Sequence, residues 1–309
     1  MKEPNKGLIL ITGGSGFLGS HVADAFTAEG YAVRIYDHQP SPHLQSGQEM
    51  IVGDIRDTER LVESAQGCEA VYHFAARADI ESTQEDGLNA IQINVLGTVS
   101  ALEAARRCGV KRFIFASTVY VFSKGGGFYR ASKQSAEHFI AAYQERYGLD
   151  FTILRFGSLY GRRAGPSNII HRVIMQSLTS KRIYYPGNGE AQREYIHVTD
   201  AANLSVRILA PEFANRHLVL TGVERLRVRD MLQMVAEIAP DQVAVEFGDQ
   251  HNRLHYMMTP YSFHPPVDHK VVSTDFVDLG QGLLDCFAEC FHILHQQQSE
   301  TPSTEQDKE

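Results

Sequence analysis

The segment Leu8-Ile-Leu-Ile-Thr-Gly-Gly-Ser-Gly-Phe-Leu-Gly19 joins an apolar run to a turn that contains Gly13, Gly16 and Gly19. A sequence suited to a helix follows, from Phe17 to Glu29. Glycines let the backbone bend sharply after a strand, and the helix beyond presents unpaired N–H groups and a partial positive charge. This order predicts a strand, a turn and a helix that together hold a pyrophosphate.

An acidic residue ends the next apolar run. The run spans Ala32 to Tyr36, and Asp37 follows it, eighteen residues after Gly19. At this place a carboxylate accepts hydrogen bonds from the ribose hydroxyls of adenosine and repels a 2′-phosphate. The sequence therefore predicts NAD rather than NADP as the cofactor. The alternative is a glycine turn with a purely structural role, which would not need the acid.

Composition limits the class of protein. The chain has 309 residues and a formal net charge of −8, and its 43% hydrophobic and 21% charged residues are ordinary for a soluble globular enzyme. The negative charge argues against nucleic acid or an anionic membrane as a partner. The chain contains no apolar run of about 20 residues and no signal-peptide pattern at Met1–Lys6. We expect a cytoplasmic protein.

The cysteines and histidines lack the spacing of a metal site or a disulfide framework. Cys286 and Cys290 share one helix face with apolar neighbours, so both are expected to be core thiols in a reducing compartment. Four histidines near the C-terminus are irregularly spaced, and we interpret them as loop and surface residues rather than metal ligands: His251, His255, His264 and His269.

Apolar runs alternate with helical segments over the first ~155 residues, which predicts a Rossmann-type doubly wound parallel sheet of the α/β class. Further strands are expected at Glu49–Val52, Ala70–Phe74, Lys111–Ala116 and Phe151–Leu154, and helices at Thr58–Gln66, Leu88–Cys108 and Arg130–Tyr147. We assign residues 1–160 and about 196–222 to this domain. Residues 161–195 and 223–295 are assigned to a smaller α/β substrate domain, and 296–309 to a disordered tail.

Two Tyr-x-x-x-Lys pairs compete for a catalytic role. The spacing places the two side chains together only on a helix. Lys124 of the Tyr120/Lys124 pair runs into three glycines, whereas Tyr129 and Lys133 lie in a good helical sequence. We therefore choose Tyr129 and Lys133. An ammonium and an oxidised nicotinamide would lower the pKa of the phenol from ~10 and make it a base.

These motifs resemble the extended short-chain dehydrogenases/reductases, in the branch of UDP-glucose 4-epimerase-like epimerases and dehydratases. The resemblance runs from about Gly7 to Cys290 and includes Thr12–Gly19, Gly53–Asp57, His73–Ala76, Asn94–Thr98, Phe113–Ser123 and Tyr129–Lys133. It implies the following cofactor residues: Gly13, Gly16, Phe17, Leu18, Asp37, Asp54, Ile55, Phe74, Ala75, Ala76, Asn94, Tyr129, Lys133 and Phe156.

The same resemblance implies a catalytic hydroxyl and a substrate site. An ungapped alignment selects Thr118 to bind the reacting sugar oxygen beside Tyr129, with Ser117 as the alternative. Arg77, Ser158 and Arg193 are implied as substrate contacts. A cation is needed there because a nucleoside diphosphate carries about two negative charges. Alternatively, Arg193 forms a surface ion pair with Glu190 or Glu194 and does not bind substrate.

Three departures affect the substrate rather than the fold. Ser158 stands where the family usually has asparagine, and Phe122-Ser123 replaces tyrosine–glycine. Only ten residues separate Thr118 from Tyr129, so the pocket is expected to be more open than in the family or to be closed by another segment.

The resemblance implies a nucleotide-sugar epimerase that acts at C4 through a 4-keto intermediate. It also implies a homodimer formed by the helices at Leu88–Cys108 and Arg130–Tyr147. Alternatives of the same fold are a 4,6-dehydratase, a decarboxylase and a keto-reductase. A non-catalytic NAD-binding module is the alternative from another class.

Overall fold

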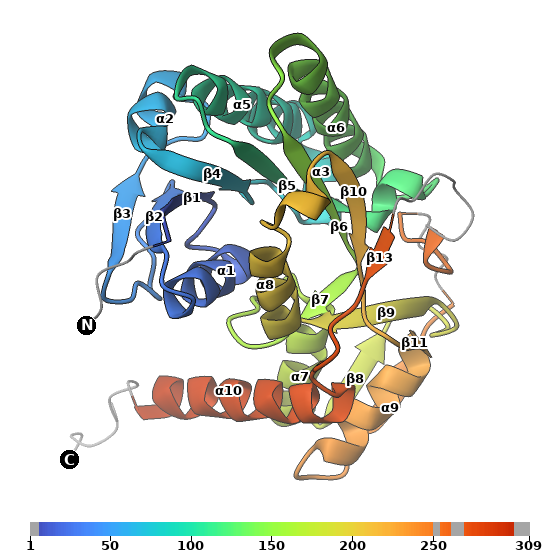
Figure 1. Ribbon diagram of the computed structural model, residues 1–309. Helices are drawn as coiled ribbons and strands as arrows, with labels where there is room; N and C mark the ends of the chain where they lie inside the picture. Colours follow the sequence, from blue (N-terminus) through green and yellow to red (C-terminus); the bar gives the residue numbers. More distant parts are fainter. Residues whose placement is uncertain (1–5, 250–253, 261–268, 300–309) are drawn as a thin grey trace, which may run out of the picture.

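A parallel sheet of eight strands forms the larger part of the protein in the computed structural model, which describes residues 6–249, 254–260 and 269–299 (Figure 1). The strands, from one edge to the other, are β13 (His269–Val271), β10 (Arg216–Leu220), β6 (Phe151–Phe156), β5 (Arg112–Thr118), β4 (Cys68–His73), β1 (Leu8–Thr12), β2 (Ala32–Asp37) and β3 (Gln48–Val52). This topology confirms the predicted Rossmann-type fold.

Helices cover both faces of the large sheet (Figure 1). One layer contains α2 (Thr58–Ala65), α5 (Gly97–Arg107) and α6 (Gly127–Tyr147), and the other contains α1 (Phe17–Ala28) and α8 (Val198–Arg207). Side chains of each strand alternate between the layers. In β1, Ile9 and Ile11 pack beneath α1 and α8, whereas Leu10 packs beneath α2 and α5. Burial on both faces explains why this strand has a continuous apolar sequence.

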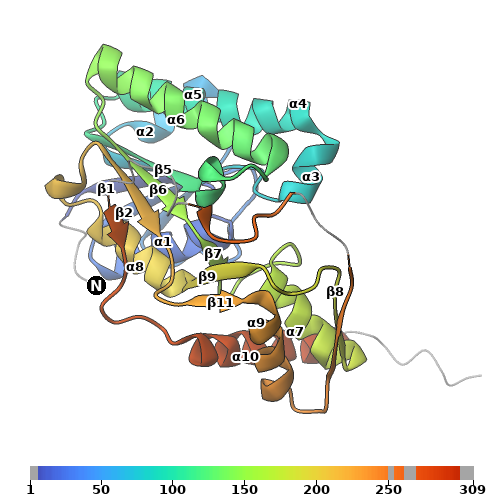
Figure 2. The same cartoon turned by 90° about the vertical axis from the view of Figure 1, so that its right-hand side faces the viewer.

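The smaller part has its own apolar core and two short sheets (Figure 2). One sheet contains β7 (Ser158–Tyr160), β9 (Gln192–His197) and β11 (Arg225–Arg227), and the other contains β8 (Arg182–Tyr185) and β12 (Ala244–Phe247). Its helices are α7 (Ile169–Ser180), α9 (Val228–Ile238) and α10 (Leu279–Ser299). Cys286 and Cys290 are buried in this core, as predicted.

Three details differ from the expected elements. The helix expected over Leu88–Cys108 consists of α4 (Gly87–Ala90), a π-helical segment at Ile91–Leu96 and α5. Strand β13 pairs with β10 in the large sheet, although its residues were assigned to the smaller domain. Helix α10 reaches Ser299, so residues 296–299 of the expected disordered tail are helical. Glutamines favour helix propagation, and no proline or glycine interrupts this stretch.

The remaining short elements connect the main ones. They are α3 (Ile80–Glu85), a 3₁₀ turn at Val119–Phe122 and another at Pro211–Phe213. No helix in the part of the chain that the structure describes is long and apolar enough to cross a bilayer.

Candidate functional site

A cleft of about 720 Å³ opens at the carboxyl ends of β1, β2, β4, β5 and β6. Strand order reverses between β1 and β4, and such a reversal is where open α/β sheets bind ligands. We call this the cofactor cleft. Thirteen of the expected cofactor residues line it: Gly13, Gly16, Phe17, Leu18, Asp37, Asp54, Ile55, Phe74, Ala75, Ala76, Tyr129, Lys133 and Phe156.

The glycine turn fits closely against the end of β4. Gly13 has φ +74°, and a Cβ on it would lie 2.5 Å from the Ala75 nitrogen. A Cβ on Gly19 would collide with the Gly13 carbonyl oxygen. Gly16 caps α1 without a side-chain hydrogen bond, so the first N–H groups of this helix face the cleft without a side-chain acceptor. The turn therefore fits the diphosphate of a dinucleotide.

Two carboxylates line the far end of the cofactor cleft. Asp37 is 7% exposed, and its Oδ2 accepts a hydrogen bond from the Ser15 nitrogen at 3.0 Å. Asp54 is half exposed, and its hydrogen bonds with Arg56 lower its pKa to about 2. An anionic end of this kind fits the hydroxyls of an adenosine ribose and disfavours an added phosphate.

Helix α6 carries the tyrosine–lysine pair as predicted. Tyr129 and Lys133 lie in its first two turns and are buried, whereas Tyr120 belongs to a 3₁₀ turn and Lys124 lies outside any helix. Thr118 ends β5 and also lines the cofactor cleft. The structure thus brings Thr118, Tyr129 and Lys133 together at one end of the cleft.

Burial controls the protonation of this group. It raises the pKa of Tyr129 to about 12, an effect that hydrogen bonding from Thr118 partly offsets. Burial also lowers the pKa of Lys133 to about 7, and the charge of Glu137 opposes this change. The expected lowering of the phenol pKa is therefore absent from the protein by itself. Lys133 Nζ lies 6.0 Å from the Tyr129 ring centre, too far to offset its loss of hydration.

The Ser117 hydroxyl is bonded to a buried carboxylate, whereas the Thr118 hydroxyl is bonded to Tyr129. The Ser117 hydroxyl donates to Glu137 Oε1 at 2.5 Å, and the Arg155 guanidinium holds both oxygens of that carboxylate. All three side chains are largely buried. The geometry therefore favours Thr118 over Ser117.

Arg77 lines the cofactor cleft, but Asn94 does not. Asn94 is buried in the π-helical segment, and its amide bonds both the nitrogen and the carbonyl of Arg77 as well as Ser132 Oγ. We infer that Asn94 fixes the loop after β4 rather than contacting a ligand. π-Helical segments often serve to place such a side chain.

Ser158 and Arg193 do not line the cofactor cleft, and Tyr256 contacts both. The Arg193 guanidinium lies 4.1 Å from the centre of the Tyr256 ring. Ser158 is a hydrogen-bonding neighbour of the Tyr256 hydroxyl, which partly offsets the rise in the tyrosine pKa caused by burial. Arg193 forms no ion pair with Glu190 or Glu194 in the described structure.

The residues around Tyr256 form a short strap, residues 254–260, next to the catalytic group. The Gly126 nitrogen donates to the Leu254 oxygen at 2.7 Å, which joins the strap to the short connection before Tyr129. His255 Nδ1 lies 2.6 Å from the Tyr120 hydroxyl. His255 lies in a loop as expected, but it is half-buried and bonded rather than a free surface residue, whereas His269 begins strand β13 instead of lying in a loop. His251 and His264 lie outside the described residues.

Sequence reasoning missed Tyr256, His255 and Glu137 as parts of this site. The strap has no periodic pattern, and its contacts join residues more than a hundred positions apart. For Glu137 the sequence did offer one indication, because it lies four residues after Lys133 on the same helix and therefore on the same helix face. Among the residues that the structure describes, no cluster of histidine, cysteine, aspartate or glutamate could hold a metal.

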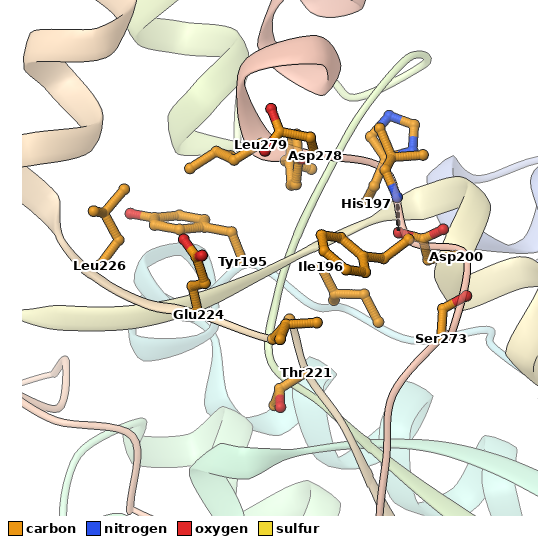
Figure 3. A pocket seen from close by; sticks show the side chains of 15 residues that line it. Tyr195, Ile196, His197, Asp200, Thr221, Glu224, Leu226, Ser273, Asp278 and Leu279 are labelled. Carbon is orange, nitrogen blue, oxygen red and sulfur yellow. Dashed lines mark hydrogen bonds between the residues drawn. The ribbon is translucent and has the colours of Figure 1, made fainter.

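A second pocket lies between β9, the loop after β10 and the start of α10 (Figure 3). Its volume is about 50 Å³, which is room for one or two waters and not for a nucleotide. Asp200 accepts a hydrogen bond from the Val277 nitrogen at 2.9 Å, shown dashed in Figure 3. Of these two pockets in the described part of the chain, only the cofactor cleft is large enough for a dinucleotide.

The family model described as "NAD dependent epimerase/dehydratase family" matches residues 9–220. A putative UDP-glucose 4-epimerase of Methanocaldococcus jannaschii is 29% identical over 65% of this chain and 73% of its own length. A UDP-N-acetyl-α-D-glucosaminuronate decarboxylase of Bacillus cytotoxicus is 30% identical over 70% of this chain and 74% of its own length.

Solved structures share the fold. The UDP-glucuronic acid 4-epimerase of Bacillus cereus, in complex with UDP-glucuronic acid and NAD, superposes with a TM-score of 0.79 at 24% identity. The match covers 93% of this chain and 99% of that one. At this identity the likeness establishes the common architecture.

Proposed function

Because the chain belongs to the NAD-dependent epimerase/dehydratase family, we propose that it is a nucleotide-sugar epimerase that acts at C4 of the sugar. The observation that carries this proposal is the grouping of Thr118, Tyr129 and Lys133 at one end of a cleft that fits NAD. A module that only binds the cofactor would not need a buried tyrosine and lysine on one helix beside that cleft.

NAD supplies a hydride acceptor and a positive ring when it is bound. The positive ring would favour the phenolate of Tyr129, which would take the proton of the 4-hydroxyl when C4 gives up hydride, and Thr118 would hold the same oxygen. Lys133 lies beside the phenol and would supply positive charge there in its protonated form. The 4-keto sugar then turns over and receives the hydride on its opposite face, while Tyr129 returns the proton. The cofactor is regenerated in each cycle.

We assign Arg77, Ser158 and Arg193 to the nucleotide-sugar end of the site. Arg77 lies on the rim of the cofactor cleft, and Arg193 is a buried cation that has no carboxylate partner among the described residues. A buried cation of this kind favours an anionic ligand such as a diphosphate.

The main alternatives are a 4,6-dehydratase, a decarboxylase and a keto-reductase. The sequence similarity to the Bacillus cytotoxicus decarboxylase supports decarboxylation as an alternative reaction. Elimination or decarboxylation calls for an additional acid or base near the sugar. The sequence contains no carboxylate between Thr118 and Tyr129, and Glu137 is occupied by Arg155 and Ser117. Epimerisation is the outcome that needs no further group.

We also propose a homodimer in the cytoplasm. Large apolar side chains are exposed along the helical layer that contains α4, α5 and α6: Leu88, Ile91, Leu96, Phe128, Phe139 and Tyr147. Leu88 is 68% exposed, which is high for a leucine and favours a partner surface. A second copy would bury this layer against its own equivalent.

A panel of UDP-, GDP-, CDP- and dTDP-sugars tests the reaction. We expect one of them to yield a stereoisomer of unchanged mass, with no net release of NADH. Mass spectrometry that shows loss of water or of carbon dioxide would assign the chain to one of the alternatives instead. Failure of every sugar nucleotide to react would support the non-catalytic module.

A further inference from the structure

Tyr256 contacts two of the three residues that we assign to the substrate. Its ring lies over the Arg193 guanidinium at 4.1 Å, and its hydroxyl neighbours Ser158. The same ring packs near Tyr120, with 4.7 Å between ring centres. Tyr120 in turn lies 6.5 Å from the ring of Tyr129. A chain of ring contacts through Tyr256 and Tyr120 thus links the expected phosphate ligand to Tyr129.

Arg193 is a poorly compensated cation in this arrangement. The side chain is 8% exposed, and one of its nitrogens donates to the Gln192 carbonyl at 2.8 Å. The described ion pairs do not include it. An aromatic face attracts a guanidinium, but a phosphate offers full negative charge and paired hydrogen bonds. A diphosphate is therefore a stronger partner for Arg193 than the ring that covers it.

The backbone on either side of Tyr256 is fixed. The Leu254 oxygen accepts from the Gly126 nitrogen and the Met257 oxygen accepts from the Gln192 nitrogen, both at 2.7 Å. His255 is bonded to the Tyr120 hydroxyl. These bonds leave rotation of the Tyr256 side chain as the smallest change that would expose Arg193 and Ser158.

We propose that Tyr256 covers the anion end of the nucleotide-sugar site and that a nucleoside diphosphate binds there by displacing its ring from Arg193 and Ser158. The proposal rests on the proposed function, because it assumes that these two residues bind substrate. Only the fraction of molecules with the ring displaced binds the nucleotide, so the ring lowers the apparent affinity by that fraction. It also keeps Arg193 covered until a diphosphate arrives.

Fluorescence gives a direct test because the chain contains no tryptophan. Tyr256→Trp introduces a single tryptophan at the covered position. Titration of the NAD-loaded protein with UDP, GDP, CDP and dTDP should shift its emission to the red as the ring moves into water. A nucleotide that binds by calorimetry without changing the emission would overturn the proposal.

Affinity gives a second test that does not depend on the tryptophan variant. Tyr256→Leu removes the aromatic cover and should bind the same nucleoside diphosphate several-fold more tightly than the unmodified protein. Phe247→Leu is the matched control, because it removes the distant Arg229–Phe247 contact at 5.4 Å and should leave affinity unchanged. Equal or weaker binding by Tyr256→Leu would show that the ring is a wall of the site and would reject displacement.

The two proposals fail in different ways. If none of the four nucleotides binds the unmodified protein or Tyr256→Leu, both the proposed substrate class and the displacement of Tyr256 are wrong. If a nucleotide binds, and Arg193→Gln weakens it, but Tyr256→Leu has no effect, only the displacement is wrong.

Discussion

Lys133 Nζ donates a hydrogen bond to the Ala116 carbonyl oxygen at 2.7 Å, so the lysine that we propose for catalysis is tied to the strand that ends in Thr118. The same nitrogen lies 4.7 Å from the centre of the Phe115 ring. One residue of α6 is therefore held to β5 by two contacts. This attachment keeps the ammonium near the phenol without a carboxylate in direct contact.

Lys133 should give the NAD-free protein a pH-dependent stability. Burial lowers its pKa from 10.5 to about 7, so above pH ~7 the folded state binds fewer protons at this site than the unfolded state. The free energy of unfolding should therefore rise from pH ~7 to pH ~10, and Lys133→Met should lack that rise. Denaturant unfolding at several pH values measures it, with the exposed Lys111→Met as the control. If the free energy of unfolding rose with pH equally in Lys133→Met and Lys111→Met, burial of Lys133 would not be the cause of the rise.

Thr118 rather than Ser117 should carry the catalytic hydroxyl. Thr118→Val should lower kcat by about 10²–10³-fold, the usual effect of losing one hydrogen bond to a reacting oxygen. Ser117→Ala should keep most of the turnover and lose about 0.5–1.5 kcal/mol of stability, because its hydroxyl serves Glu137. Steady-state kinetics measures the loss of kcat in each variant, and thermal unfolding measures the loss of stability. A larger kinetic loss in Ser117→Ala would reverse the assignment.

Tyr129 should be the base. Tyr129→Phe should keep the fold and NAD but lose about 10²–10⁴-fold in turnover, since it removes the proton acceptor. Tyr120→Phe removes only the hydroxyl bonded to His255 and should be mild. Comparing kcat of the two variants checks the choice between the tyrosines. The opposite ranking would identify Tyr120 as the base.

Asp37 should set the preference for NAD. Asp37→Ala should narrow the difference in Kd between NAD and NADP, because the buried carboxylate that would face a 2′-phosphate is gone. Calorimetric titration of both cofactors measures the change. Equal affinity of the unmodified protein for the two cofactors would refute this role.

The exposed apolar layer should mediate dimerisation. Phe139→Glu places a charge within the layer on α6 and should shift the mass found by light scattering from dimer to monomer. Phe291→Glu on α10 is the control, because Phe291 is comparably exposed on another element. A monomeric mass for the unmodified protein at micromolar concentration would remove the basis for the dimer.

The sequence located residues that line the cofactor cleft but did not locate the contacts around Tyr256, for a physical reason. Strand ends such as Asp37 and Thr118 follow continuous apolar runs, so local pattern locates them. The choice of Tyr129 over Tyr120 also needed only helical spacing and three glycines. By contrast, the contact between Tyr256 and Arg193 joins two segments that no local pattern relates.

Neighbouring strands of the large sheet come from separated stretches of the chain. After β6 the chain builds part of the smaller domain, returns for β10, leaves again and returns for β13. During synthesis, one edge of β6 therefore stays unpaired until residues 216–220 have emerged from the ribosome. An open strand edge pairs readily with other chains, so this interval is the period of greatest risk of aggregation. The complete sheet, in turn, makes it difficult for either part to unfold alone.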